Sequence, residues 1–250
     1  MLSSLMGRVG VGCRRRHASA APRAVVEPRR EEALALVRRD GHALKDLLPG
    51  LRDDKEVVLA AVERHGSALQ HASLRLKADR EVVLAAARQD GSGALQHASP
   101  ELRASRTVVL TAMRQKGLAL QYASPELSGD RAAVLAAVES DGRALQFASP
   151  DLRAERRVVL AAVRQNGFAL QYASPDLRGD SAVALAAMGS NVRVLQFASA
   201  DRQGDRGMAL AAVTRNGLAL AAYASSRFRA DREVVLAAVR ENGFALQHAS

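Results

Sequence analysis

Residues 158–174 read VVLAAVRQNGFALQYAS, and residues 234–250 read VVLAAVRENGFALQHAS. Less exact copies of this stretch recur along most of the chain. When they are aligned on the segment D-R-x-V-V-L-A-A-V, the copies are spaced by 25 or 26 residues. They begin near residues 29, 54, 79, 105, 130, 155, 180, 205 and 231. A fixed period of this length is typical of a solenoid, in which each unit packs on its two neighbours.

Each unit reads as two helices and a final turn. The Asp at the unit start is a good N-cap, because its carboxylate accepts hydrogen bonds from the first free amides. Apolar residues then follow with the helical period and leave only the third and tenth positions polar, here Glu56 and Glu63, so we expect a first helix buried nearly all round. The next glycine, Gly66 in this unit, stands where a left-handed residue commonly ends a helix.

A short second helix, x-A-L-Q-[HYF]-A-S, follows the glycine, and S-P-[DE]-L then predicts a single helical turn with Ser as its cap and Pro in first position. β-Branched valine does not indicate strands here, because the valines recur with period 3.6 between caps and alanines. The sequence therefore predicts an all-α fold, an α-solenoid of about nine tandem helix–turn–helix repeats over residues 29–250.

The unit V-V-L-A-A-V-R-Q-N-G-x-A-L-Q-Y-A-S-P-[DE]-L-R-x-D resembles the repeat family of protist and algal proteins called domain of unknown function 4116. The likeness covers roughly residues 30–250. It implies tandem helical repeats and brings no assigned activity. The chain departs from the pattern at Ser105, where Asp is expected, at Val192, where Gly is expected, and at Ala222, where Gln is expected. These departures put single caps and contacts in doubt, and not the fold.

The first 28 residues differ from the repeats in composition. Residues 1–30 hold seven Arg and one Glu, whereas residues 31–250 hold 29 basic and 25 acidic residues. The leader has no acid before Glu27, and Leu2, Leu5, Met6 and Val9 fall at helical spacing. This profile predicts an organelle transit peptide, mitochondrial rather than plastid because of the arginines. A disordered basic tail on a cytoplasmic protein is the alternative.

Several classes of protein find no support in the sequence. Cys13 is the only cysteine, so no intrachain disulfide can form. No uncharged apolar run approaches the ~20 residues of a membrane helix, and we expect no membrane partner. His71 and His97 share a unit position that holds Tyr or Phe in most other units, which favours packing over metal binding. We find no catalytic constellation and expect no enzyme activity, no cofactor, no metal and no small-molecule substrate.

Two sets of positions are candidates for binding. A glutamine recurs on the second helix, either as a ladder of amides bonded between units, which the sequence favours, or as an exposed polar stripe. These glutamines are Gln70, Gln96, Gln121, Gln146, Gln171, Gln196 and Gln247. The residue after the glycine position changes from unit to unit, and it is Arg143, Phe168, Arg193 or Phe244 in four of them.

These features predict a non-enzymatic scaffold that binds an unknown protein partner. The alternative is an organellar RNA- or DNA-binding protein, because one variable residue per repeat is also how some helical repeats read bases. The units are faintly similar to transcription-activator-like effector repeats, but they lack a clear basic stripe.

The last unit stops at Ser250 without its S-P-D-L turn. We expect either that the chain is a fragment of a longer array, which we favour, or that this end docks a partner.

Overall fold

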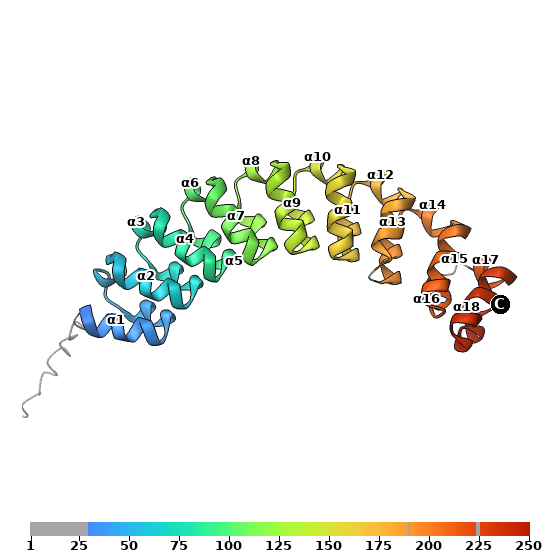
Figure 1. Ribbon diagram of the computed structural model, residues 1–250, viewed down its shortest axis with the longest axis horizontal. Helices are drawn as coiled ribbons and strands as arrows, with labels where there is room; N and C mark the ends of the chain where they lie inside the picture. Colours follow the sequence, from blue (N-terminus) through green and yellow to red (C-terminus); the bar gives the residue numbers. More distant parts are fainter. Residues whose placement is uncertain (1–29, 190, 224–225) are drawn as a thin grey trace, which may run out of the picture.

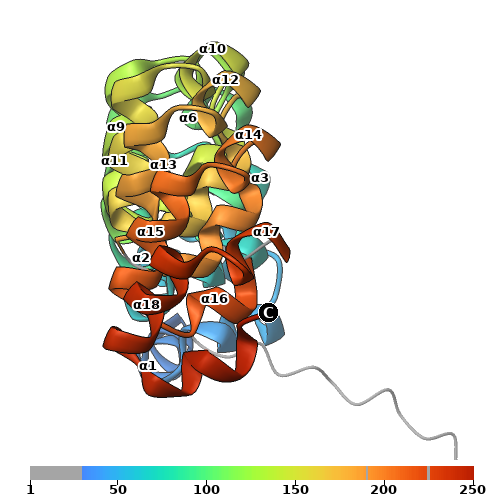
Figure 2. The same cartoon turned by 90° about the vertical axis from the view of Figure 1, so that its right-hand side faces the viewer.

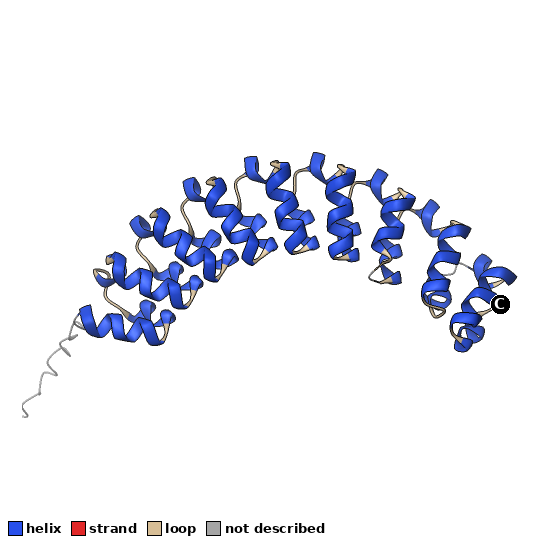
Figure 3. Cartoon of the chain, viewed as in Figure 1, coloured by secondary structure: helices blue, strands red, loops and turns tan. Residues whose placement is uncertain are grey.

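The computed structural model describes residues 30–189, 191–223 and 226–250, and these form an arch of stacked helical units (Figure 1). The described residues contain no strand (Figure 3). The predicted all-α solenoid is therefore confirmed. The leader predicted over residues 1–28 lies outside the described residues.

Each unit opens with a long helix that crosses the arch from its convex to its concave edge (Figure 1). The helix starts where the sequence places its cap. Asp54, for example, accepts hydrogen bonds from the amides of Glu56 and Val57 at 2.9 and 3.2 Å. Ser105 and Glu155 occupy the same position without a side-chain cap bond. The long helices are α1 (Arg30–Arg39), α2 (Lys55–Arg64), α4 (Arg80–Gln89), α7 (Arg106–Gln115), α9 (Arg131–Ser140), α11 (Arg156–Gln165), α13 (Ser181–Ala187), α15 (Arg206–Arg215) and α18 (Arg232–Glu241).

The second helix of each unit forms a second layer beside the long helices (Figure 2). In most units it is a 3-10 helix, which suits a segment of only six residues. The extra residue of the third unit makes its counterpart α-helical. These elements are η1 (Gly41–Asp46), η3 (Gly66–His71), α5 (Gly91–His97), η4 (Gly117–Tyr122), η5 (Gly142–Phe147), η6 (Gly167–Tyr172), η7 (Val192–Phe197), α16 (Ala219–Tyr223) and η8 (Gly243–His248).

A single helical turn then leads along the convex edge to the next unit, as predicted (Figure 1). These turns are η2 (Leu51–Asp53), α3 (Leu74–Lys77), α6 (Pro100–Arg103), α8 (Pro125–Ser128), α10 (Pro150–Arg153), α12 (Pro175–Arg178), α14 (Ala200–Gln203) and α17 (Ser226–Arg229). The Ser before a turn also donates its backbone N–H to the previous unit; Ser149 reaches the carbonyl of Ser128 at 2.9 Å, and Ser174 reaches that of Arg153 at 2.9 Å. This bond fixes the register between neighbouring units.

The glycine after the long helix is not the left-handed C-cap that its position suggested. Gly66 has no left-handed φ, and His65 before it is already extended, at φ −140° and ψ 107°. A Cβ on Gly66 would lie 2.5 Å from the carbonyl oxygen of Ala86, which belongs to the next unit. Across Gly41, Gly66, Gly91, Gly117, Gly142 and Gly217 this distance is 2.1 to 2.5 Å. The prediction was wrong about the reason for glycine: the close approach of the next unit requires it.

The core is one apolar column that runs through the whole stack. In α2 the side chains of Val57, Val58, Ala61 and Val62 are fully buried, as the pattern predicts. The expectation of burial nearly all round was too strong, because Leu59 and Ala60 on the outer side are only partly buried. In the last described unit Leu246 is 62% exposed, whereas its counterparts in the eight preceding units are at most 2% exposed.

Candidate functional site

The variable positions lie along the concave edge of the arch. The short turns such as α8 and α10 follow the convex edge, and each long helix starts there (Figure 1). The last residues of the long helices and the turns that open the second helices therefore line the concave edge. Arg143, Phe168, Arg193 and Phe244 each stand one residue after the glycine position of such a turn.

A local hydrogen bond holds these residues at the edge. Asn191 precedes the turn of the seventh unit, and its side chain accepts from the backbone N–H of Arg193 at 2.8 Å. Asp141, Asn166, Asn216 and Asn242 make the same bond two residues onward, at 3.0 Å. Asn and Asp favour this turn because their short side chains reach the backbone two residues later. The backbone is thus held alike in each of these units, while the next side chain varies.

The four candidate side chains differ in their exposure and in their interactions with neighbouring residues. Phe244 is 77% exposed, whereas Phe168 is partly buried and meets Phe197 edge-on, with ring centroids 6.2 Å apart. The guanidinium of Arg143 makes a bidentate pair with Asp141, at 2.8 and 3.1 Å. This pair holds the pKa of the Asp141 carboxyl below its usual range. Arg193 is exposed, and Asn191 stands where Asp141 stands in the other unit, so this arginine lacks the paired carboxylate.

The seven glutamines belong to the second layer. Gln70, Gln96, Gln121, Gln171, Gln196 and Gln247 are exposed, and Gln146 is half-buried. Gln146 donates to the carbonyl of Arg143 at 3.1 Å, and Gln171 donates to that of Phe168 at 3.0 Å. Both bonds stay inside one unit. For these two residues the amide ladder between units, which the sequence favoured, is therefore wrong, and an exposed polar stripe describes the set better.

One departure from the regular edge lies among the last three units. A hollow of about 500 Å³ opens there, lined by Asn191, Val192 and Arg193 of the seventh unit, by Asn216 and Leu218 of the eighth, and by Gln247 of the ninth. The structure thus brings Arg193 and Gln247, two of the predicted binding residues, to one site. Arg143 and Phe168 do not line it.

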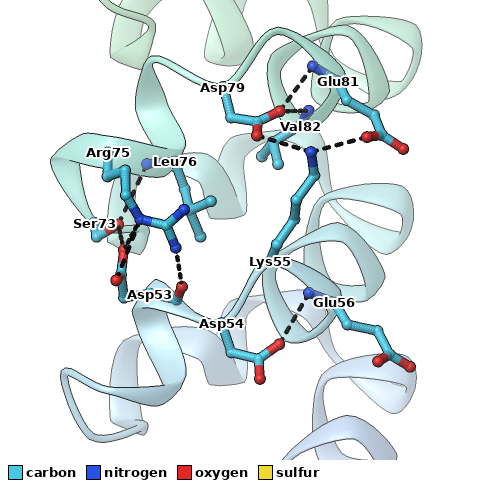
Figure 4. A network of polar contacts seen from close by, with 10 residues as sticks. All are labelled: Asp53, Asp54, Lys55, Glu56, Ser73, Arg75, Leu76, Asp79, Glu81 and Val82. Carbon is cyan, nitrogen blue, oxygen red and sulfur yellow. Dashed lines mark hydrogen bonds and ion pairs between the residues drawn. The ribbon is translucent and has the colours of Figure 1, made fainter.

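A ladder of ion pairs, which sequence reasoning missed, links the units near the convex ends of the long helices. The first residue of one long helix pairs with the cap acid of the next unit, as in Lys55–Asp79 at 2.8 Å (Figure 4). Further pairs of this kind are Arg30–Asp54, Arg106–Asp130, Arg131–Glu155, Arg156–Asp180 and Arg206–Asp231. The repeated D-R or D-K dipeptide was the available signal. The cap acids Asp54 and Asp231, for example, are thereby held by helix amides and a neighbouring cation, whereas Glu155 has the ion pair without a cap bond.

The histidines of the described residues are partly buried in the stack. Burial lowers the pKa of His71 and His97, which keeps both neutral to a lower pH than a free imidazole. The rings of His42 and His65 stack with centroids 4.6 Å apart. Over the described ranges there is no group of three or more His, Cys, Asp or Glu side chains that could hold a metal ion. None of the helices in these ranges is long and apolar enough to span a bilayer.

By its geometry the protein is an α-solenoid of helical repeats with a variable concave edge. The family model described as domain of unknown function (DUF4116) matches residues 29–77, 54–103, 79–128, 105–153, 130–178, 155–202 and 205–250. The chain belongs to this family, and the resemblance predicted from the repeated unit is confirmed. No curated protein and no solved structure matches the chain.

Proposed function

We propose that the protein is a non-enzymatic scaffold that binds a protein partner along its concave edge. One observation carries this proposal: the buried positions repeat almost letter for letter, whereas the residue after each turn varies and is displayed by the same local hydrogen bond. Since loops placed by a rigid framework commonly carry binding residues, the variable edge is where specificity belongs.

The absence of enzyme activity is part of the same proposal. The recurrent carboxylates are the groups best suited to general acid or base work, but the unit-start acids are already engaged. Asp231, for example, accepts from Arg206 and from the amides of Glu233 and Val234. These contacts, with that of Arg206 the strongest, lower its pKa to about 2, so it is a poor base at neutral pH.

The charge distribution favours protein over nucleic acid. A groove for phosphates needs an uninterrupted basic stripe. The concave ends of the long helices and their turns carry acids as well as bases, among them Asp40, Glu63, Asp90, Glu139 and Glu241. These carboxylates would repel a phosphate backbone at several successive units.

A photo-crosslinking experiment tests the proposal. We place p-benzoyl-phenylalanine at Phe244 on the concave edge, and in a matched control at Leu74, which opens α3 on the convex edge and is 84% exposed. Irradiation in the cells that produce the protein should give discrete protein adducts, unaffected by nuclease, from position 244 and not from position 74. Equal adducts at both positions, or adducts that nuclease removes, would overturn the proposal.

We further propose that residues 1–28 direct the protein to mitochondria, because this stretch combines apolar residues at helical spacing with arginines and almost no acid. A fluorescent protein carrying residues 1–28 should enter mitochondria, and one carrying the same residues with Arg8, Arg14, Arg15 and Arg16 replaced by Gln should not. A cytosolic or plastid location of the first fusion contradicts the assignment.

A further inference from the structure

The hollow among the last three units arises where the repeat departs from its own rule. Val192 stands at the position of the close-approach glycine. At the regular joints a Cβ would fall 2.1 to 2.5 Å from the next unit's carbonyl, so a valine cannot be accommodated at that spacing. In keeping with this, α13 contacts α15 much less extensively than α11 contacts α13 or α15 contacts α18.

A second departure removes side-chain volume from the same place. The eighth unit has the alanine pair 221–222 where the other units have one glutamine. Ala221 lines the hollow, and its methyl group occupies far less space than a glutamine side chain. The second helix of this unit also begins later, since α16 spans Ala219–Tyr223. The hollow therefore results from sequence departures in two units, the seventh and the eighth.

The lining has a defined chemistry. Arg193 supplies a positive charge, and none of the described residues that line the hollow carries a carboxylate. The side-chain oxygens of Asn191 and Asn216 already accept from backbone amides, at 2.8 and 3.0 Å, so their NH₂ groups are the part that can serve a ligand. Val192 and Leu218, the latter 41% exposed, add apolar surface beside these donors. A cation, amide donors and an apolar wall suit a carboxylate next to an apolar side chain.

We propose that this hollow binds an acidic segment of a protein partner, with the carboxylate of an Asp or Glu on Arg193 and a neighbouring apolar side chain against Leu218. This inference rests on the proposed scaffold function and adds the chemistry of the partner. Arg143 is the matched counterpart within the chain: it has the same position in its unit, but Asp141 already neutralises it. Charge complementarity therefore assigns the acidic segment to the seventh unit and not to the fifth.

The test uses the full chain and a random peptide library displayed on phage. The enriched peptides should contain Asp or Glu beside an apolar residue, and their affinities are then measured by fluorescence anisotropy. Arg193→Ala should weaken binding about tenfold or more, as expected for loss of a charged hydrogen bond. Arg143→Ala should change it less than about twofold, because that arginine is already paired. Exchange of the peptide's acid for its amide should reproduce the loss.

The outcomes separate this inference from the scaffold function. Enriched peptides without acids, or equal losses in the two arginine variants, overturn the inference; the scaffold function stands if the crosslinked partner is still found. Tighter binding of single-stranded RNA than of any peptide, lost in Arg193→Ala, would show that the hollow serves phosphates and would also overturn it. Circular dichroism of both variants confirms that each remains folded, since both side chains are exposed.

Discussion

The glycine that precedes or opens most second helices limits how closely two units can stack. In Gly142→Ala the new Cβ would meet the carbonyl oxygen of Ala162 at 2.3 Å, so one unit must move. We expect a loss of about 1–3 kcal/mol in the free energy of unfolding, as for other overpacked cores. Gly243→Ala is the matched control, because no atom lies within 4 Å of its Cβ position. Urea unfolding should show the control unchanged or more stable; equal losses in both variants would contradict this role.

Ser105 interrupts the series of ion pairs between units, because it stands where other units have the cap acid. Ser105→Asp should supply both a cap for α7, which now has none, and a partner for Arg80 of the preceding unit. The cap alone is worth about 0.5–2 kcal/mol. Ser181→Arg restores only the ion pair with the cap acid Asp205, which has its cap bond already, and should add less than about 1 kcal/mol.

The pH dependence gives an independent check on this ladder. Hydrogen bonds from a neighbouring arginine and from helix amides lower the pKa of Asp231 to about 2. A group whose pKa is lower in the folded state stabilises the protein above its unfolded pKa of about 4, and that stabilisation is lost as the pH falls toward 2. By analogy with Asp231, the gain from Ser105→Asp should be full at pH 7 and mostly lost as the pH falls to 2. A gain that persists at pH 2 would show that the carboxylate is not its source.

At the scale of the element, α13 and α15 form the weakest joint of the stack. The helix α13 ends at Ala187, about one turn earlier than its counterparts, and Val192 stands where the regular joints have the close-approach glycine. Regions of a protein with few buried apolar contacts open locally more often than well-packed regions. Hydrogen exchange measured by mass spectrometry should therefore be faster over α13 and α15 than over α9 and α11. Equal protection across the two pairs would contradict a loosened joint.

The elements themselves could largely be predicted from the sequence, because caps and apolar period are local signals. Asp54, Pro100 and the valines of α2 stand where those rules place them. The role of Gly66 could not be predicted, since it depends on how far apart two units lie. The partner of Gln146 lies inside its own unit, and a repeated glutamine alone does not distinguish this bond from one to the next unit. The hollow at Val192 was visible only as a departure from the repeat. That this departure opens a hollow could be seen only once the stacked units were in place.

At the scale of the whole molecule, the stack should gain stability from each added neighbour. In α18 the side chains of Val235 and Val239 are only partly buried, although their counterparts in α2 are fully buried. One more unit after Ser250 would cover them and Leu246. Each apolar side chain buried contributes about 1.5–3 kcal/mol. The melting temperature should rise by roughly 5 °C or more. An unchanged melting temperature would contradict the expectation that each added unit-to-unit interface increases the stability of the stack.

We propose that the concave edge of the arch binds a protein. The most direct measurement is hydrogen exchange of the full chain with and without the crosslinked partner in purified form. Binding should slow exchange in the turns around residues 141–143, 191–193 and 216–218, and leave the convex turns α6, α8 and α10 unchanged. Slowed exchange confined to those convex turns, with the concave edge unaffected, would contradict binding along the concave edge.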